Sequence, residues 1–513
     1  MGGSFSGIGG FLILSNRISL TQETLGSGAW QFATLVTQGI VQLAVTAVLA
    51  RLLGPAEFGV VAVANIAIGF AGIFSKFGFG QAIVQQKILT DRYIRVAFSL
   101  SICVAVLLTT LIILIAPIFA LFFHNPEITG VLRALSLCVL FNNFSIVAEF
   151  LLVREIAFRK LFWVSFFTYT LGYAVCGIIM AMCGYGVWAL VGAAIGTSLV
   201  HAVVLILLKP HPKRLLFAAA EFRKLTGYGG GVTLSTLFKF IANNGDNFIV
   251  GRCLGSASLG IYQQAFNIMV IFARYLGDVL ERVLFAVASR IQEQTDRLSL
   301  AYCHSLSIIH LLLVPISVMM IVLAPELVMV YLGPKWRDAV QPAQLLMIGL
   351  TFRCQSRISD AFVNALGVVY RPALRKVVFA LAVIIGAWFG KNWGIAGVAL
   401  AITISMVIDC FLTLELGLRL TSTKLSTYAK GVIPGFILGL VAYLACFSIS
   451  NYLRHIYLSS FLVLFCSIAV TTIFLVIFAI CFKKLLGTSG IWLFKQLFNL
   501  LQSKLASTMA KKV

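Results

Sequence analysis

The chain has 513 residues, of which 60% are hydrophobic and only 11% are charged, whereas about 25% of the residues of an ordinary soluble domain are charged. Its formal net charge is +22, but binding of nucleic acid requires a solvated basic domain, and no polar segment is long enough to form one. The composition therefore excludes a soluble fold and nucleic acid as a partner, and it predicts an all-α polytopic membrane protein, because spanning helices satisfy their own backbone groups in lipid.

Apolar runs of about eighteen residues or more, each able to cross roughly 30 Å of hydrocarbon as a helix, recur along the chain. The first six predicted spans lie at 27–50, 57–85, 93–119, 130–152, 161–183 and 187–208. Six further spans follow at 226–250, 258–288, 299–323, 340–366, 374–390 and 395–418, and two more at 430–450 and 458–482. We therefore expect about fourteen transmembrane helices.

The spans group into an N-terminal lobe (1–208), a basic cytoplasmic linker (209–225), a C-terminal lobe (226–418), two extra helices (419–482) and an amphipathic cytoplasmic tail (483–513). Short cytoplasmic loops retain lysine and arginine, and translocated loops lose them. Arg154, Arg159 and Lys160 form one such basic loop, and basic and nearly neutral loops alternate along the chain. This alternation predicts an inner-membrane protein with both termini in the cytoplasm.

Two halves of the chain carry similar motifs. Residues 51–59 read RLLGPAEFG and residues 252–260 read RCLGSASLG, so that the arginine and both glycines keep one spacing. Gly186 and Gly394 begin a second matched pair, GVWAL and GIAGV. An even number of spans per repeat returns the chain to the same side of the membrane. The pattern therefore predicts two six-helix lobes of parallel topology with a cavity between them that opens alternately to each face.

Three segments resemble the polysaccharide transporter (Wzx/WzxC-like) flippases of the multidrug/oligosaccharidyl-lipid/polysaccharide (MOP) superfamily. They are ARLLGPAEFGVVAVA at 50–64, FGFGQAIVQQ at 77–86 and DNFIVGRCLGSASLGIY at 246–262. The resemblance implies a V-shaped two-lobe fold. It also implies a flippase that moves an undecaprenyl-diphosphate-linked oligosaccharide, a repeat unit of O-antigen, capsule or exopolysaccharide, from the cytoplasmic to the periplasmic leaflet. The expected partners are this substrate, membrane lipids and the polymerase and chain-length machinery, with the chain itself a monomer.

Charges inside the spans are the natural markers of a diphosphate site. Each costs about 2.5–3.5 kcal/mol at the bilayer centre unless it faces a cavity or a partner. Arginine can bind two phosphate oxygens as a fork, and lysine supplies a point charge. The predicted substrate-binding residues are Lys76, Lys239, Arg274, Arg353, Arg357 and Arg133. The alternative is that each cation pairs with a carboxylate, as Arg357 could with Asp360, or extends to the membrane surface.

Asp246 follows two asparagines, Asn243 and Asn244, so that three oxygen-bearing side chains lie close together on the seventh span. Such a cluster could bind a proton or a sodium ion and couple transport to a gradient. Structural capping of this span is the alternative. We expect no metal and no organic cofactor, because the eleven cysteines and six histidines are scattered without ligand spacing.

Three other functions are compatible with a chain of this class. A periplasmic polysaccharide polymerase or ligase would need a sizeable outer loop with acid, base or cation groups, and the longest predicted outer loop, 324–339, is short. We therefore predict that the chain is not an enzyme. A MATE-type multidrug antiporter would favour an anionic cavity, which the excess of arginine and lysine opposes. A MurJ-like flippase for lipid II would share a cationic cavity, so charge does not separate it from the polysaccharide flippases.

Overall fold

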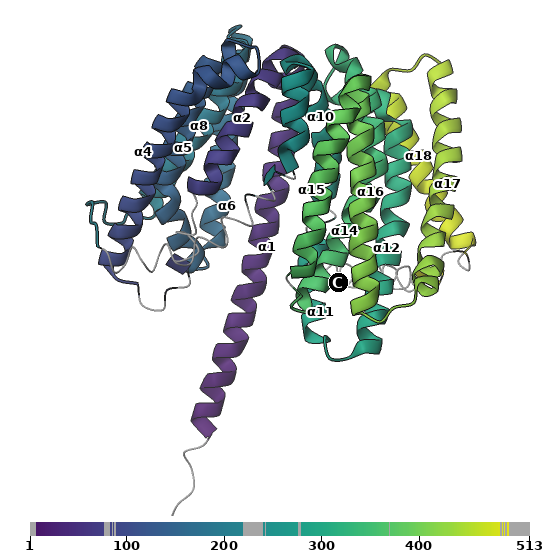
Figure 1. Cartoon of the computed structure of the whole chain (residues 1–513). Helices are drawn as coiled ribbons and strands as arrows, with labels where there is room; N and C mark the ends of the chain where they lie inside the picture. Colours follow the sequence, from purple (N-terminus) through teal and green to yellow (C-terminus); the bar gives the residue numbers. More distant parts are fainter. Residues whose placement is uncertain are drawn as a thin grey trace, which may run out of the picture. The chain divides into compact units, whose positions relative to one another are not determined.

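The computed structural model describes residues 7–75, 89–218, 243–274, 279–368 and 370–482, with a few single positions outside these ranges. Every regular element within these ranges is helical, which confirms the predicted all-α class (Figure 1). The chain divides into two compact units, Met1–Leu237 and Phe238–Val513. Lys76, Lys239, the span between 226 and 236 and most of the tail after Phe482 lie outside the described residues.

The first unit begins with a helix of 46 residues, α1, which extends well beyond its neighbours in Figure 1. Its candidate membrane span is Trp30–Leu52, close to the predicted 27–50, but the helix itself begins at Gly7. Continuing an existing helix adds one hydrogen bond per residue, so a span can extend beyond the apolar residues that predict it. The helices of this unit are α1 (Gly7–Leu52), α2 (Pro55–Ser75), α4 (Asp91–Phe122), α5 (Glu127–Arg154), α6 (Phe158–Phe167), η1 (Thr168–Val175), α7 (Cys176–Met182) and α8 (Val187–Leu208).

A π-helix, η1, separates α6 from α7 within the segment predicted as one span at 161–183. Gly172 lies in the middle of η1, and a Cβ at this position would come within 2.5 Å of the Thr197 backbone on α8. The hydroxyl of Tyr173, also in η1, is 3.5 Å from the hydroxyl of Thr46 on α1. The wide turns of η1 therefore pack directly between two neighbouring helices.

The second unit contains the remaining helices and ends with the two extra spans. Gly394, which begins α16, has a φ of 68°, and Gly186, its counterpart before α8, has a φ of 54°. These left-handed conformations favour glycine at both matched positions. The elements of this unit are α10 (Ser256–Ala273), α11 (Val279–Arg290), α12 (Thr295–Val322), α13 (Ala324–Tyr331), η3 (Pro334–Ala339), α14 (Val340–Ala365), α15 (Tyr370–Gly390), η4 (Lys391–Trp393), α16 (Gly394–Leu420), α17 (Leu425–His455) and α18 (Ser460–Cys481).

The extra helix α17 packs closely on α12 of the same unit. Three glycines spaced four residues apart lie at this contact: Gly431, Gly435 and Gly439. A Cβ on Gly435 would come within 2.7 Å of the carbonyl carbon of His310, so the two backbones nearly touch. Near the end of α17, the guanidinium of Arg454 donates two hydrogen bonds, of 2.7 and 2.9 Å, to the carboxylate of Glu326 on α13. The second unit therefore holds α17 through both packing and charge.

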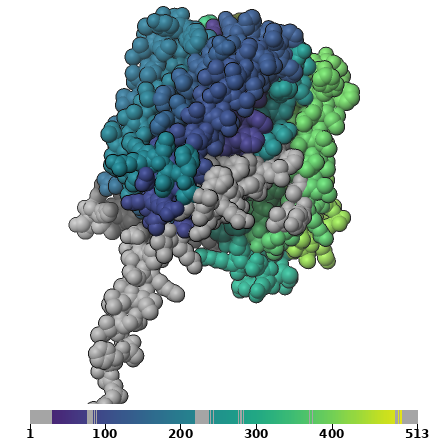
Figure 2. Space-filling model, turned by 60° about the vertical axis from the view of Figure 1, so that its left-hand side comes forward, coloured from purple at the N-terminus to yellow at the C-terminus, as the bar shows by residue number. Residues whose placement is uncertain are grey.

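Ten segments within the described residues are long and apolar enough to cross a membrane. Their outward surfaces are apolar, as on α4, where large side chains recur on one helical stripe at Leu107, Leu111, Leu114, Ile118 and Leu121 and are 47% to 77% exposed. Figure 2 shows the surface to which α4 and α5 contribute, in blue. Since soluble monomers rarely expose apolar patches of this extent, the stripe faces lipid, and the chain is a multi-pass membrane protein.

Candidate functional site

Arg353 lies on α14 inside the second unit and borders a hollow of about 220 Å³. Its guanidinium carbon is 5.6 Å from the ring centre of Phe266 on α10, a cation–π contact worth roughly 0.5–2 kcal/mol. Its Nε is buried and has no hydrogen-bond partner in the described part of the chain. The hollow is lined by Asn243, Asp246, Phe266, Arg353, Phe379, Val383, Ile402 and Met406. Arg353 is therefore a cation inside the helical unit, beside a narrow hollow, with one donor atom that no described residue satisfies.

Asp246 faces the same hollow and is only 3% exposed. One carboxylate oxygen accepts a hydrogen bond of 2.6 Å from the Tyr262 hydroxyl, and the other accepts one of 2.9 Å from the Asn247 backbone. Arg353 is close enough to interact with this carboxylate electrostatically. Two hydrogen bonds and a nearby cation thus stabilise a buried anion that would otherwise be costly in this environment.

The carboxylates of α14 and α16 are directed at cations of α15. The ammonium of Lys376 lies 3.0 Å from Asp360 and 2.9 Å from Asp409, so one lysine pairs with two carboxylates. Nearly two turns further along α16, Glu415 pairs with both Arg375 and Arg419. These two clusters hold α14, α15 and α16 together at one end.

Arg274 and Arg357 form a second concentration of positive charge. Arg357 packs against the backbone of Gly277, because a Cβ added at Gly277 would lie 3.3 Å from the Cδ of Arg357. Arg274, at the end of α10, is near enough to repel it electrostatically. Asp360, three residues further along α14, lies near enough to attract the same guanidinium and offsets part of this repulsion.

The structure brings three of the predicted site residues, Arg353, Asp246 and Asn243, to one hollow. Asn244 instead donates a hydrogen bond of 3.0 Å to the Phe240 carbonyl, one turn back on its own helix. Arg133 belongs to the first unit, is exposed, and has its Nε 3.4 Å from the Ile113 carbonyl. Lys76 and Lys239 lie outside the described residues.

Tyr262, which donates a hydrogen bond to Asp246, and Phe266, which lines the hollow beside Arg353, were not predicted as site residues from the sequence. They stand four residues apart on α10 and therefore share one face of that helix. The only signal in the sequence was the position of Tyr262 at the end of the segment 246–262 quoted above.

The sequence profile of the family described as "Polysaccharide biosynthesis protein" matches residues 48–341, more than half of the chain. The chain belongs to this family. Among its relatives, the lipopolysaccharide biosynthesis protein WzxC of Escherichia coli is 23% identical over 77% of this chain and 81% of its own length. The succinoglycan biosynthesis transport protein ExoT of Rhizobium meliloti is 27% identical over 61% of this chain and 63% of its own length.

Solved structures show the fold of this polysaccharide biosynthesis protein. The lipid II flippase MurJ in an inward closed conformation matches with a TM-score of 0.72 at 15% identity, over 89% of this chain and 99% of that chain. An inward-facing multidrug resistance MATE transporter of the MOP superfamily matches with a TM-score of 0.62 at 15% identity, over 75% and 95%. The predicted resemblance is thus confirmed, and with it the expectation of a membrane transporter rather than an enzyme.

Proposed function

We propose that this chain flips an undecaprenyl-diphosphate-linked oligosaccharide from the cytoplasmic to the periplasmic leaflet of the bacterial inner membrane. The observation that carries the proposal is Arg353, a cation in a membrane-embedded hollow with a buried Nε that lacks a partner among the described residues. A diphosphate supplies the anionic oxygens that such a group binds most strongly. The nearby pair Arg274 and Arg357 adds positive charge, and an organic cation would be repelled by it.

The proposal includes fourteen spans, two lobes that together form a V, and cytoplasmic location of both termini. Of the ten segments described above, Leu374–Leu420 has 47 residues and comprises two helices, α15 and α16, that fold back on each other around η4. Helix α14 has 26 residues and is long enough to cross, although it carries Arg353, Arg357 and Asp360. We assign the helical residues 243–253 to the seventh span and the pair α10–α11 to the eighth, which supports the proposed count of fourteen.

Alternating access of a cavity between the lobes then moves the diphosphate and sugars, while the prenyl chain stays in lipid. In this proposal the chain acts as a monomer and delivers its substrate to the polymerase and chain-length machinery on the periplasmic side.

A reconstituted transport assay tests the proposed function. The purified full chain is placed in liposomes that contain the lipid-linked oligosaccharides extracted from its host, and a lectin or glycosidase outside reports arrival in the outer leaflet. We expect sugar exposure many times faster than in protein-free liposomes, and no acceleration of ethidium transport. Faster movement of ethidium with unchanged sugar exposure would establish a cation antiporter instead. Faster flipping of lipid II alone would show that the chain transports the peptidoglycan precursor instead.

We also propose that Asp246 couples this movement to a proton gradient. Its carboxylate is buried at the hollow, beside Asn243 and within reach of the charge of Arg353, so its protonation state changes the net charge that the diphosphate meets. A proton suits the site better than sodium, which requires several oxygen ligands, because both carboxylate oxygens already accept hydrogen bonds.

The variant Asp246→Asn is expected to retain a basal flipping rate but to lose its response to an imposed pH gradient, because an amide cannot take up the proton. The measurement is the initial flipping rate in liposomes with and without a pH gradient, and with and without a sodium gradient. Asn244→Asp serves as a matched control, because Asn244 is hydrogen-bonded to the Phe240 carbonyl and does not line the hollow. Equal gradient dependence in the wild type and in Asp246→Asn would rule out this role.

A further inference from the structure

The linker segment that follows α8 is fixed to the start of α4 within the first unit. The Leu216 backbone N–H donates a hydrogen bond of 2.8 Å to the Ser99 hydroxyl on α4. The Arg95 Nε, one turn earlier on that helix, donates one of 3.0 Å to the Arg214 carbonyl. The Leu216 side chain packs on the buried cluster that α4 and α5 share. This part of the linker is therefore held against a helix.

Two contacts nearer α8 fix the direction of the segment. The Lys209 ammonium pairs with the Glu155 carboxylate, just beyond the end of α5. The His211 ring packs edge-on against the Phe98 ring of α4, with ring centres 5.4 Å apart. Since the chain is held on both sides of residue 213, the side chains that follow keep defined directions.

These side chains alternate between the protein and its surroundings, as they do in an extended chain. Leu216 and Ala218 pack on the cluster of α4 and α5. Leu215 and Phe217 face away from it, and they are 59% and 65% exposed. Two large apolar side chains are thus presented outward from a fixed backbone.

The position of the segment along α4 places it at the surface of the hydrocarbon layer. α4 has 32 residues and is about 48 Å long, whereas the hydrocarbon layer is roughly 30 Å thick. A helix of this length that is centred in the layer enters the hydrocarbon about six residues from its start, close to Ala97. Ser99, and with it Leu216, therefore lies where headgroups meet acyl chains. The lipid-facing stripe that begins at Leu107 continues further along the helix.

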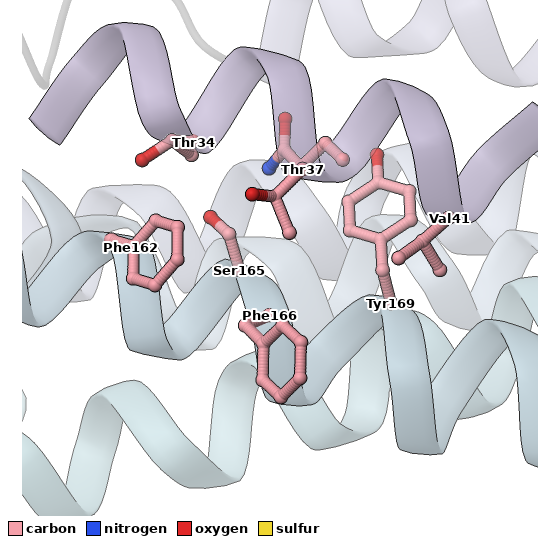
Figure 3. A pocket seen from close by; sticks show the side chains of 8 residues that line it. Thr34, Thr37, Val41, Phe162, Ser165, Phe166 and Tyr169 are labelled. Carbon is pink, nitrogen blue, oxygen red and sulfur yellow. The ribbon is translucent and has the colours of Figure 1, made fainter.

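Aromatic and basic side chains also mark this end of the first unit. Trp30, the first residue of the candidate span in α1, packs on Phe162 of α6 with ring centres 5.2 Å apart. The Arg159 guanidinium lies 5.8 Å from the centre of the Trp30 ring. Figure 3 shows Phe162 at the Thr34 end of the contact between α1 and α6. Tryptophan rings gather at the headgroup level of membranes, so this end of the unit lies at an interface.

Positive charge accompanies the two outward apolar side chains. Lys213 and Arg214 are exposed, and residues 209–218 contain no acidic side chain. An anionic phospholipid fits both features, because its phosphate attracts the two cations and its acyl chains accept Leu215 and Phe217. A zwitterionic phospholipid fits less well, because it carries an ammonium group that the two cations repel.

We propose that Lys213, Arg214, Leu215 and Phe217 form a binding site for an anionic phospholipid in the leaflet at the start of α4. In the proposed orientation this is the cytoplasmic leaflet. The proposal does not depend on what the chain transports. Because the same linker leads on to the second unit, the bound lipid holds the point at which that connection leaves the first unit.

Hydrogen exchange of the full chain in nanodiscs tests this site. The amides of 213–217 are followed in dioleoylphosphatidylcholine alone and in a mixture with dioleoylphosphatidylglycerol. We expect the anionic lipid to slow their exchange by at least about fivefold, the effect of one basic residue near an anionic surface. The double variant Lys213→Gln, Arg214→Gln should exchange at one rate in both lipids. In phosphatidylcholine alone it should match the wild type, because the contacts with α4 remain.

A matched control separates this site from a general effect of net charge. The double variant Arg290→Gln, Arg297→Gln removes two exposed arginines at the connection between α11 and α12. It should keep the slowing at 213–217. An equal loss of the slowing in this control would overturn the proposal, as would equal exchange of the wild type in the two lipids.

Two further measurements identify the ligand as a lipid. Glycerol phosphate added to phosphatidylcholine nanodiscs should leave the exchange unchanged, because it has no acyl chain, and slowing by it would establish a site for soluble anions instead. The double variant Leu215→Ser, Phe217→Ser should lose most of the slowing by phosphatidylglycerol. Unchanged slowing in that variant would refute a site that binds the acyl chains together with the phosphate.

Discussion

Replacement of Arg353 by alanine is expected to abolish export of the surface polymer without loss of the protein from the membrane. The guanidinium borders the hollow with its Nε unused, and a hydrogen bond to a charged group contributes about 1.5–3 kcal/mol, or roughly 10- to 100-fold in binding, for each bond lost. We expect the same of Lys76→Ala from its position in the second predicted span. Surface polymer is measured in a strain that depends on this gene, alongside the amount of protein in the membrane fraction.

Two controls separate this effect from misfolding. Arg353→Lys keeps the charge beside Asp246 but loses the forked geometry, and it should retain partial export. Arg337→Ala removes an exposed arginine of η3 and should export normally. Full polymer production in both Arg353→Ala and Lys76→Ala would refute the assignment of these cations to the diphosphate.

Replacement of Lys376 by methionine is expected to reduce the amount of folded protein severely. The lysine is the shared partner of Asp360 and Asp409, whose side chains are 21% and 9% exposed, and its loss leaves two carboxylates facing each other. Removing one partner of a buried ion pair costs about 3–5 kcal/mol, and we expect the lower end because Lys376 is itself about a third exposed. The measurement is monodisperse protein by size exclusion in detergent, with its Tm.

The triple variant Lys376→Met, Asp360→Asn, Asp409→Asn provides the decisive comparison. Since it removes the carboxylates together with the lysine, it should recover most of the lost stability. Lys430→Met, at an exposed position on α17, should behave as the wild type. A single variant Lys376→Met with unchanged yield and Tm would show that the three charges do not stabilise the fold.

The span positions could be predicted because they depend on composition alone. Helix α8 occupies 187–208 as predicted, and α14 ends one residue from its predicted limit. The pairing of charges could not be predicted from the sequence, since it depends on which helices pack side by side. The sequence indicated Asp360 as a neighbour of Arg357 at i+3, but only the packing of α15 on α14 and α16 brings Asp360 and Asp409 to Lys376.

The candidate site was predicted in part for the same reason. Arg353 and Asp246 were identified because charges in apolar runs are conspicuous, whereas Tyr262 and Phe266 resemble any aromatic residues of a spanning helix. The π-helix left no signal either, because the residues 168–175 are as compatible with an α-helix as their neighbours are. Its wider turns become visible only where Gly172 meets the backbone of α8.

A π-helical turn contains one residue more than an α-helical turn needs, so η1 accommodates an extra residue between the helices α6 and α7. Each residue of an α-helix advances the side chains by about 100° around its axis. Because the wider turns of η1 absorb one such step, α6 and α7 keep nearly the relative orientation that a continuous α-helix one residue shorter would give them. Deletion of one residue from 168–175 would therefore let the segment rewind as an α-helix while Phe162 and Phe166 still face α1. The extra residue instead sets the width of the turns that meet Thr46 of α1 and the backbone of α8.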